Sequence, residues 1–361
     1  MFPSRQLRRF AVAAFSLLAV VAAACSTSTA ATGNGGKCKP AASPVLTLAA
    51  YSNVYDVYGK LTSSSGTFIT DWKAKHNDQT PIFQASYGGS TTQAENVVNG
   101  FKADIVALSL DPDVETIQKA GLITHNWKND PDASHVATSA VVFDVRPGNP
   151  KHIQNWNDLT QPGLQILTPD PAQSGGARWN IVAAYGAAMR GQVPGYKAND
   201  PADAQRLLEG IFKNVTVLDK SANDSLKNFD SGNGDVAITY DYALQQAKAA
   251  GGEDQIVVPP STVAIQTPTV VVDKNAQEHC VLPLANAFVK YLHTPDAQDT
   301  FQSVGFERPI DVATAKKGTD NEPSIKDFFT TDQLGGWDKL QSDTVFGPNG
   351  AFTKAFKAAK G

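Results

Sequence analysis

The sequence predicts an α/β protein whose sheets are mainly parallel. From Pro44 onward, short apolar segments typical of strands alternate with longer segments typical of helices. Turns containing glycine and serine follow several of the strand-like segments, and 361 residues suffice for two domains on a prior of about 150 residues each. Because ligands of such sheets lie beyond the carboxyl ends of the strands, a binding site is expected at these turns.

The first 24 residues (1–24) are expected to be an export signal outside the fold. A basic stretch at 5–9 precedes an apolar run at 10–24 that is too short to span a bilayer comfortably. Small residues then precede Cys25, as in a bacterial lipobox, so we expect Cys25 to be the lipidated first residue of the mature chain. Ordinary secretory cleavage near Ala24 is the alternative, and the paired arginines also permit a twin-arginine signal.

Residues 25–43 are expected to be the lipidated cysteine and a flexible tether. The stretch is rich in Ser, Thr, Ala and Gly and has no apolar pattern, so its span is roughly 25 Å. Two further cysteines, Cys38 and Cys280, favour one disulfide in an exported chain, with two unpaired thiols as the alternative.

The charge balance argues against nucleic acid as a partner. The whole chain has a net charge of −4, and without the three signal arginines it has 28 basic against 35 acidic residues, or −7. Nucleic-acid binding needs a basic surface. An anionic ligand would therefore be held by local donors rather than by overall charge.

The elements expected in the first part of the chain follow the alternation. Strands are predicted at 45–51, 82–87, 104–109 and 137–145, and helices at 55–76, 91–99 and 112–120. In the second part, strands are predicted at 164–167, 215–218, 236–239, 256–258 and 269–272. Helices are predicted at 156–159, 179–190, 202–213, 284–293 and 295–304.

The most informative turn is Ser174-Gly175-Gly176-Ala177-Arg178-Trp179. It lies between the predicted strand at 164–167 and the predicted helix at 179–190. A strand end, two glycines and a helix start place several backbone N–H groups around one point, where the helix dipole favours an anion. Taken alone, the same pattern is also typical of an ordinary turn.

Four similar turns strengthen this interpretation. They are Ala50-Tyr51-Ser52-Asn53, Ser86-Tyr87-Gly88-Gly89-Ser90, Asp219-Lys220-Ser221-Ala222-Asn223 and Thr239-Tyr240-Asp241. Each one by itself is explained as a helix cap, where Ser and Asn are favoured. Together they could aim several hydrogen-bond donors at one cleft.

From about residue 46 to about residue 308, the chain resembles the sulfate-binding proteins that deliver the anion to ABC importers. The motifs that carry the resemblance, in chain order, are Tyr87-Gly88-Gly89-Ser90, Val98-Asn99-Gly100, Ala103-Asp104-Ile105-Val106, Arg146-Pro147-Gly148-Asn149-Pro150-Lys151, Trp156-Asn157-Asp158-Leu159, Ser174-Gly175-Gly176-Ala177-Arg178-Trp179-Asn180, Lys213-Asn214-Val215 and Gly234-Asp235-Val236. So many matches in the same order argue strongly against similarity by chance.

The resemblance implies a two-lobed periplasmic-binding-protein-like fold of type II, with the ligand in the cleft between the lobes. Lobe one would comprise 44–139 and 270–330, and lobe two 140–269. The hinge would run through 139–145 and 264–271, and the C-terminal segment 331–361 could cross back between the lobes.

The resemblance also implies the ligand contacts. They would be the N–H of Ser52, the hydroxyl of Ser90, the hydroxyl and N–H of Ser174, the N–H groups of Gly175, Gly176 and Ala222, and the side chain of Tyr240. Asp113 and Arg178 would support peptide groups of the site from behind. The family typically has Asp at the position of Ser52 and Trp at the position of Tyr240, so a phenol replaces an indole donor here.

These contacts imply sulfate as the ligand, with no cofactor and no metal. Partners would be the permease and ATPase of an ABC importer and, through Cys25, the outer face of the cell membrane, and we expect a monomer. Thiosulfate and molybdate are alternative ligands. An enzyme is not expected, because the chain has no H-E-x-x-H, G-x-S-x-G or G-x-x-x-x-G-K-[ST] motif.

Overall fold

One mixed sheet organises the protein. In the computed structural model, which describes Cys38, residues 41–318, Glu322 and residues 324–361, ten strands pair in the order β2-β1-β3-β9-β4-β7-β5-β6, with β10 beside β9 and β8 beside β4. Residues 39–361 form one compact unit. The strands are β1 (Val45–Tyr51), β2 (Ile82–Gly88), β3 (Ile105–Ala107), β4 (His135–Val145), β5 (Ile166–Pro169), β6 (Val215–Asp219), β7 (Val236–Tyr240), β8 (Gln255–Val257), β9 (Ser261–Val271) and β10 (Asp327–Phe329).

Helices fill the intervals between the strands. The α-helices are α1 (Tyr55–Leu61), α2 (Thr67–Lys75), α3 (Ser90–Val98), α4 (Asp111–Lys119), α5 (Gly175–Met189), α6 (Pro201–Asn214), α7 (Ala222–Asp230), α8 (Asp241–Ala249), α9 (Asp273–Glu278), α10 (Leu282–Tyr291), α11 (Pro295–Ser303), α12 (Val312–Ala315), α13 (Gly336–Lys339) and α14 (Ala351–Lys360). Short 3₁₀ turns include η1 (Ser52–Val54) and η4 (Trp156–Thr160). The expected alternation of strands and helices is confirmed.

Two long antiparallel strands join the two ends of the sheet. The first part of β4, residues 135–140, pairs with residues 264–268 of β9. Beyond this segment β9 pairs with β3, whereas β4 pairs with β7 and β8. We call β2, β1, β3 and the end of β9 the first half-sheet. We call β7, β5, β6 and the end of β4 the second half-sheet.

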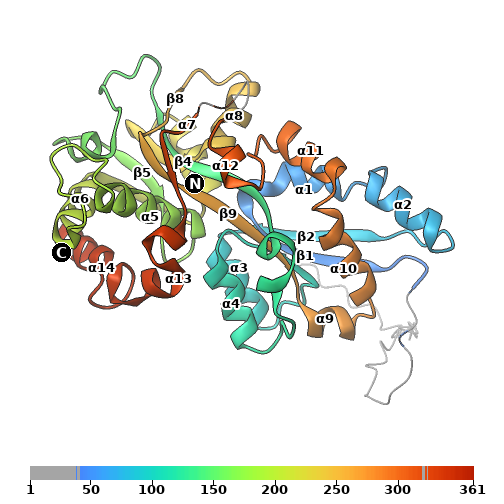
Figure 1. The fold of residues 1–361 in the computed structure, drawn as a ribbon. Helices are drawn as coiled ribbons and strands as arrows, with labels where there is room; N and C mark the ends of the chain where they lie inside the picture. The colour runs from blue at the N-terminus through green and yellow to red at the C-terminus, as the bar shows by residue number, and fades with distance from the viewer. Residues whose placement is uncertain (1–37, 39–40, 319–321, 323) are drawn as a thin grey trace, which may run out of the picture. The chain divides into compact units, whose positions relative to one another are not determined.

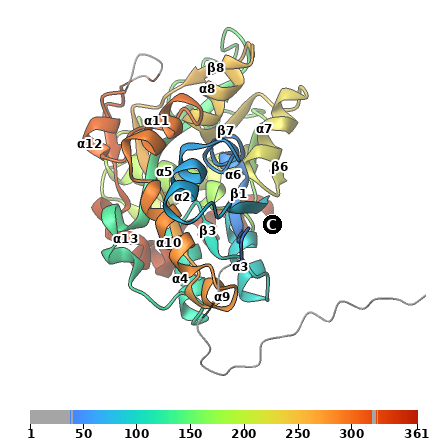
Figure 2. The same cartoon turned by 90° about the vertical axis from the view of Figure 1, so that its right-hand side faces the viewer.

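Each half-sheet has its own covering helices (Figure 1). Helices α5, α6 and α14 lie beside the second half-sheet, and α1, α2, α10 and α11 lie beside the first, with β9 running from one group to the other. The view turned by 90° shows α3, α4 and α9 together at one edge (Figure 2). The strands of a parallel sheet are buried on both faces, which explains runs such as 236–240 in which every residue is buried.

Several boundaries differ from the sequence-based prediction for physical reasons. The predicted helix at 55–76 is two helices, because the chain turns between Thr62 and Gly66. Strand β9 begins eight residues earlier than expected, and Pro268 lies inside it, opposite the irregularity in β4 at His135. Helix α14 was not predicted; it packs on α6, where Phe352 and Phe356 lie 5.2 and 5.5 Å from the ring of Phe212.

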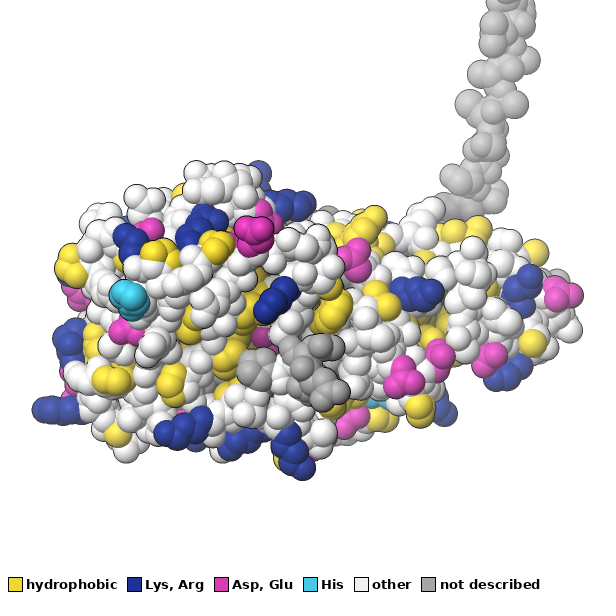
Figure 3. Space-filling view, turned by 90° about the horizontal axis from the view of Figure 1, so that it is seen from above, with side chains coloured by type: hydrophobic (Ala, Val, Ile, Leu, Met, Phe, Trp, Pro, Cys, Tyr) yellow, Lys and Arg dark blue, Asp and Glu magenta, His cyan; other side chains and the backbone are white. Residues whose placement is uncertain are grey.

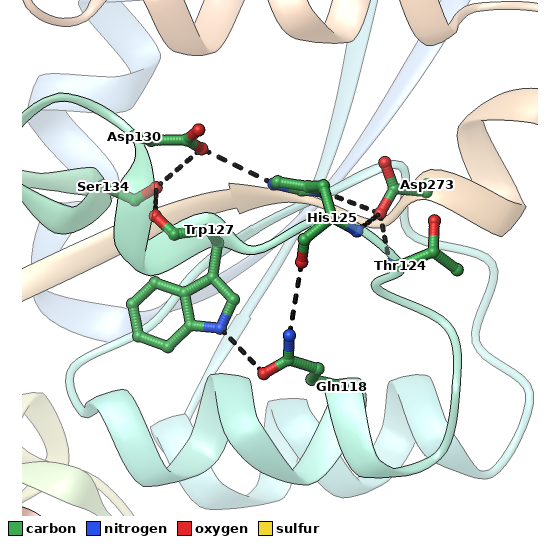
Figure 4. Close-up of polar contacts among 7 residues, drawn as sticks. All are labelled: Gln118, Thr124, His125, Trp127, Asp130, Ser134 and Asp273. Carbon is green, nitrogen blue, oxygen red and sulfur yellow. Dashed lines mark hydrogen bonds and ion pairs between the residues drawn. The ribbon is translucent and has the colours of Figure 1, made fainter.

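A polar network fixes the loop between α4 and β4 (Figure 4). The Asp273 carboxylate accepts from the Thr124 N–H at 2.6 Å and contacts His125 Nδ1 at 2.7 Å. The Trp127 indole donates to Gln118 Oε1 at 3.2 Å, and Ser134 donates to Asp130. This network attaches the loop before β4 to Asp273, which follows β9 in the first half-sheet.

Charged side chains of both signs are spread over one face of the molecule (Figure 3). On the face shown in Figure 3, basic and acidic side chains of the described residues are interspersed rather than gathered by sign. Within the described part of the chain, no helix combines the length and apolar character needed to span a bilayer. Cys25 and the expected signal and lipobox lie outside the described residues.

Candidate functional site

A small cavity lies where the turns singled out in the sequence meet. Its lining residues come from both half-sheets and are Tyr51, Ser52, Asn53, Gly88, Gly89, Ser90, Ser109, Ser174, Gly176, Ser221, Ala222 and Tyr240. Its volume is about 10 Å³, room for about one water-sized sphere and far below the roughly 300–1,000 Å³ of pockets for drug-sized ligands. The cavity therefore suits a small ion rather than a sugar or a peptide.

Four helices begin at this cavity. Ser90 starts α3, Ser174 precedes the first residue of α5, Ala222 starts α7, and Tyr240 precedes α8. The first N–H groups of a helix have no partner within it and carry the positive end of its dipole. Among the described residues that line the cavity, none has a charged side chain. The arrangement offers neutral donors to an anion from several directions.

The two glycines of the opening motif allow helices and strands to approach closely. Helix α5 begins at Gly175, four residues earlier than predicted, so the glycines form its first turn. A Cβ on Gly176 would lie 3.0 Å from Tyr240 Cε2 and 3.3 Å from Ala222 Cβ. A Cβ on Gly175 would lie 2.8 Å from Ser109 Oγ. Any side chain here would push the first turn of α5 away from the cavity.

Gly175 is the one predicted contact that the cavity lining does not include. Its backbone instead packs beside Ser109 and Leu110 of the first half-sheet side. The other predicted contacts, Ser52, Ser90, Ser174, Gly176, Ala222 and Tyr240, all lie at the cavity. Ser90, Ser174, Ala222 and Tyr240 are each at most 4% exposed.

The Ser90 hydroxyl has a different partner from the expected one. It donates to Asp113 Oδ2 at 2.6 Å and accepts from the Ser109 N–H at 2.9 Å. Asp113 also accepts from the Thr91 hydroxyl at 3.1 Å. A buried carboxylate takes the nearest hydroxyl donors because an unpaired buried charge is costly. Asp113 thus supports hydroxyl groups at the start of α3 rather than peptide groups.

The donors at Ser174 are also divided differently. Its N–H donates to the Asp170 carbonyl at 2.8 Å, which closes the turn before α5 and takes this N–H away from the cavity. The Ser174 hydroxyl makes no hydrogen bond to other described residues. It is therefore the group of Ser174 that can donate to a ligand in the cavity. Arg178 donates to the Pro171 carbonyl at 3.1 Å and braces the same turn.

Ser109 is a site residue that the sequence reasoning missed. It follows β3, and its hydroxyl lies 2.7 Å from the Tyr240 hydroxyl. Its carbonyl accepts from the indole N–H of Trp179, on α5, at 2.7 Å. Its position at the carboxyl end of a strand was the available signal, but the contacts come from residues 70 and 131 positions away. Ser109 joins the first half-sheet to α5 and to β7.

Electrostatics keep the Tyr240 phenol neutral. Burial raises its pKa far above the ordinary value, the Ser109 hydrogen bond offsets part of this, and the carboxyl groups of Glu307 and Asp113 raise it further. Burial also raises the pKa of Asp113, against the lowering effects of the Ser90 hydrogen bond and of Arg178. Tyr240 therefore remains a hydroxyl that can donate or accept.

An ion pair lies at the junction of the half-sheets, directly after Tyr240. Arg308 Nε donates to Asp241 Oδ2 at 2.6 Å, and the two side chains are 0 and 2% exposed. Asp241 Oδ1 accepts from the Ser139 hydroxyl and the Ala140 N–H in β4. Burial and the nearby carboxylates of Asp241 and Glu322 raise the pKa of Glu307 well above its ordinary value.

A wider cleft adjoins the cavity on the outside. It shares Ser52, Asn53, Gly88 and Ser221 with the cavity and is further lined by Tyr55, Asp56, Tyr87, Asn223, Asp224, Leu226, Lys227, Ala243 and Gln246. Across this region the Thr92 N–H donates to the Gln173 carbonyl at 3.3 Å. Elements of both half-sheets thus meet around the cavity.

Comparisons with known proteins agree with this geometry. Residues 67–307 match a family described as bacterial extracellular solute-binding protein. The sulfate-binding protein of Salmonella typhimurium is 41% identical over 84% of this chain and 89% of its own length. That of Synechococcus elongatus is 36% identical, with 88% and 87% covered. The thiosulfate-binding protein of Pseudomonas aeruginosa is 30% identical, with 88% and 93% covered.

Solved structures show the same fold. The sulfate-binding protein SubI from Mycobacterium tuberculosis superposes with a TM-score of 0.72 at 30% identity, covering 82% of this chain and 98% of that one. A periplasmic thiamin binding protein gives a TM-score of 0.64 at 12% identity and covers 90% and 100%. The second likeness concerns the fold alone.

Proposed function

The chain belongs to the bacterial extracellular solute-binding protein family, and from this premise we propose that it captures sulfate outside the cytoplasm and delivers it to an ABC importer. As a solute-binding protein it is a component of transport rather than an enzyme, and no cofactor is indicated. The sulfate-binding relatives cover most of its length, which supports the same ligand here.

The observation that carries the proposal is the meeting of four helix starts at one small cavity without a charged lining residue. Sulfate at neutral pH is fully deprotonated, so it accepts hydrogen bonds and donates none. We propose that the Ser174 hydroxyl, the N–H groups at Ser52, Gly176 and Ala222, the start of α3 at Ser90, and the Tyr240 hydroxyl hold it. Gly175 contributes by letting α5 approach.

The strength of such a site is sufficient without a cation. A hydrogen bond to a charged group contributes roughly 1.5–3 kcal/mol net. About six of them give roughly 9–18 kcal/mol before the costs of association and closure, whereas micromolar affinity needs about 8 kcal/mol. Fixed donors can therefore hold a dianion at useful affinity.

Discrimination against phosphate follows from the same donors. Near neutral pH phosphate carries a proton that needs an acceptor, and an unmet buried polar group costs about 1–3 kcal/mol. The lining offers hydroxyl oxygens, such as those of Ser109 and Tyr240, but no carboxylate. We expect sulfate to bind more tightly than phosphate, and thiosulfate, which shares shape and charge, to compete with sulfate.

Calorimetric titration of the mature chain with sulfate tests the proposal. We expect one site of micromolar or tighter affinity, displacement by thiosulfate and little displacement by phosphate. Ser174→Ala should weaken binding about tenfold or more, because one charge-assisted hydrogen bond is lost. Asp71→Asn, at an exposed position of helix α2, is the matched control and should bind normally. Absence of sulfate binding by the folded wild type would refute the assignment.

We further propose that the chain is exported and anchored through lipid on Cys25, with 25–43 as the tether. The extracytoplasmic location of the family supports export. Mass spectrometry of membrane-extracted protein should find an acylated N-terminal cysteine, and Cys25→Ser should release the protein into the medium. A mature N-terminus elsewhere, without lipid, would contradict the anchor.

We also propose that the two half-sheets act as lobes that close on the ligand, and that Cys38 pairs with Cys280 in a monomer. Both cysteines are disulfide-bonded. Peptide mapping without reductant should recover one cross-linked peptide containing both. Scattering should give a monomeric mass and a smaller radius of gyration with sulfate; an unchanged radius would count against closure.

A further inference from the structure

A second cavity lies between β4, α7, α8 and β8 and shares no lining residue with the sulfate site. Asp144 of β4, Asp230 at the end of α7 and Asp254 before β8 each offer one carboxylate oxygen, and these oxygens lie within 4.8 Å of one another. Leu244, Ala247, Lys248, Gly252 and Ile256 complete the lining. The three acids come from separate elements that the fold brings together.

The negative charge of this cluster is poorly compensated. Asp144 is 3% exposed, and among the described residues its side chain makes no hydrogen bond and no ion pair within 4 Å, with Oδ1 fully enclosed. The nearby guanidinium of Arg146 reaches only Asp254, at 4.0 Å. That guanidinium is otherwise used by the carbonyls of Phe229, Asn233 and Gly234 and stacks on the Phe229 ring.

The Asp144 carboxylate is enclosed, lies beside two other carboxylates and receives no hydrogen bond from the described residues. A bound cation would be the missing partner. Buried charges in proteins are paired or coordinate metals. The position is thus one at which added positive charge is favourable.

We propose that Asp144, Asp230 and Asp254 form a binding site for a hard divalent cation, with Ca²⁺ as the ion that fits best. Ca²⁺ takes six to eight oxygens at about 2.3–2.6 Å, so two of its ligands can lie up to about 4.6–5.2 Å apart. Three oxygens that lie within 4.8 Å of one another can reach one Ca²⁺ after small side-chain movements. Mg²⁺, with bonds of about 2.0–2.1 Å, would require the acids to move closer.

The exposed side of Asp230 leaves room for water to complete the coordination. Three carboxylates with solvent ligands are typical of the weaker extracellular class, with Kd of roughly 10⁻⁴–10⁻³ M. The ion would tie β4 to the end of α7 and to the loop between α8 and β8. No residue of this site lines the sulfate cavity.

Thermal unfolding and calorimetry of the mature chain in sulfate-free chloride buffer test the proposal. In about 10 mM CaCl₂ we expect Tm to rise by a few degrees over NaCl of matched ionic strength, and calorimetry to give one Ca²⁺ site. MgCl₂ should give a smaller shift. Asp144→Asn and Asp254→Asn should each remove the calcium-dependent shift, whereas Asp71→Asn, an exposed acid of α2, should keep it.

Two results would overturn the proposal. One is a wild-type Tm that does not respond to Ca²⁺, which would mean that protons and Arg146 satisfy the cluster. The other is an undiminished shift in folded Asp254→Asn, which would place the ion elsewhere. Asp254 is partly exposed in a loop, so this variant should fold even if Asp144→Asn does not.

Discussion

Tyr240 places a phenol at the position where the resemblance to sulfate-binding proteins led us to expect an indole. A phenol can both donate and accept, whereas the indole expected there only donates. In the structure the Tyr240 hydroxyl already contacts the Ser109 hydroxyl at 2.7 Å, and either oxygen can be the donor. This pair is one part of the cavity lining that could accept the hydrogen bond donated by protonated phosphate.

Replacing Tyr240 with Trp should therefore increase the preference for sulfate over phosphate. An indole cannot accept the hydrogen bond that protonated phosphate donates. Loss of this hydrogen bond should weaken phosphate binding by about 1–3 kcal/mol, which is roughly 5- to 150-fold in relative affinity. Calorimetry with both anions measures the ratio. Ser109→Ala is the companion variant, because it leaves the Tyr240 hydroxyl in place. Equal ratios in wild type and Tyr240→Trp would show that this hydroxyl does not set selectivity.

At the scale of elements, the start of α5 decides the geometry of the cavity. Gly176 lies two residues after Ser174, the N-cap position of the helix, and its missing side chain lets Tyr240 and Ala222 approach. Helix starts act only over the first turn, so a displacement of α5 removes both its N–H groups and its dipole from the ligand.

Gly176→Ala should weaken sulfate binding about 5- to 100-fold, because the added Cβ would be 3.0 Å from Tyr240 Cε2 and overpacking costs about 1–3 kcal/mol. Gly59→Ala is the matched control. Gly59 lies in α1 with nothing within 4 Å of an added Cβ, so affinity should not change and stability should rise by about 0.5–1 kcal/mol. Calorimetry and urea unfolding separate the two effects; normal affinity in Gly176→Ala would show that this close approach is not needed.

The sequence predicted the elements around the cavity better than the contacts within it. Strand β1 lies where its apolar run placed it, and the turn at Ser174 is at the site. The start of α5 was misplaced because glycines disfavour helices locally, and here tertiary packing overrides that preference. Ser109 was missed because its partners, Trp179 and Tyr240, come near it only in the folded chain. The partner of the Ser90 hydroxyl was unpredictable for the same reason.

At the scale of the whole molecule, the junction between the half-sheets concentrates buried charge. Glu307 is 1% exposed, and both of its carboxylate oxygens lack hydrogen-bond partners among the described residues. Burial, Asp241 and Glu322 raise its pKa well above the ordinary value. The folded state therefore keeps a proton that the unfolded chain releases above its ordinary pKa of about 4.3.

Glu307→Gln should consequently be more stable than the wild type at pH 7. A raised folded-state pKa gives a contribution to stability that is present at low pH and is lost as the pH rises above about 4.3. The difference between variant and wild type should grow from about pH 4 toward pH 8 in urea unfolding. Glu209→Gln, on α6, is the control and should give a curve parallel to the wild type. A Glu307→Gln curve that is also parallel would contradict the assignment.

The hydrogen bond from the Trp179 indole to the Ser109 carbonyl has an optical consequence. The donor belongs to α5 beside the second half-sheet, and the acceptor follows β3 in the first. The fluorescence emission wavelength of an indole depends on its hydrogen bonding and on its contact with water. Separation of the half-sheets would change both for Trp179. The protein thus carries a native fluorophore at the place where the two half-sheets meet, and the proposed closure on sulfate should change its emission without any added label.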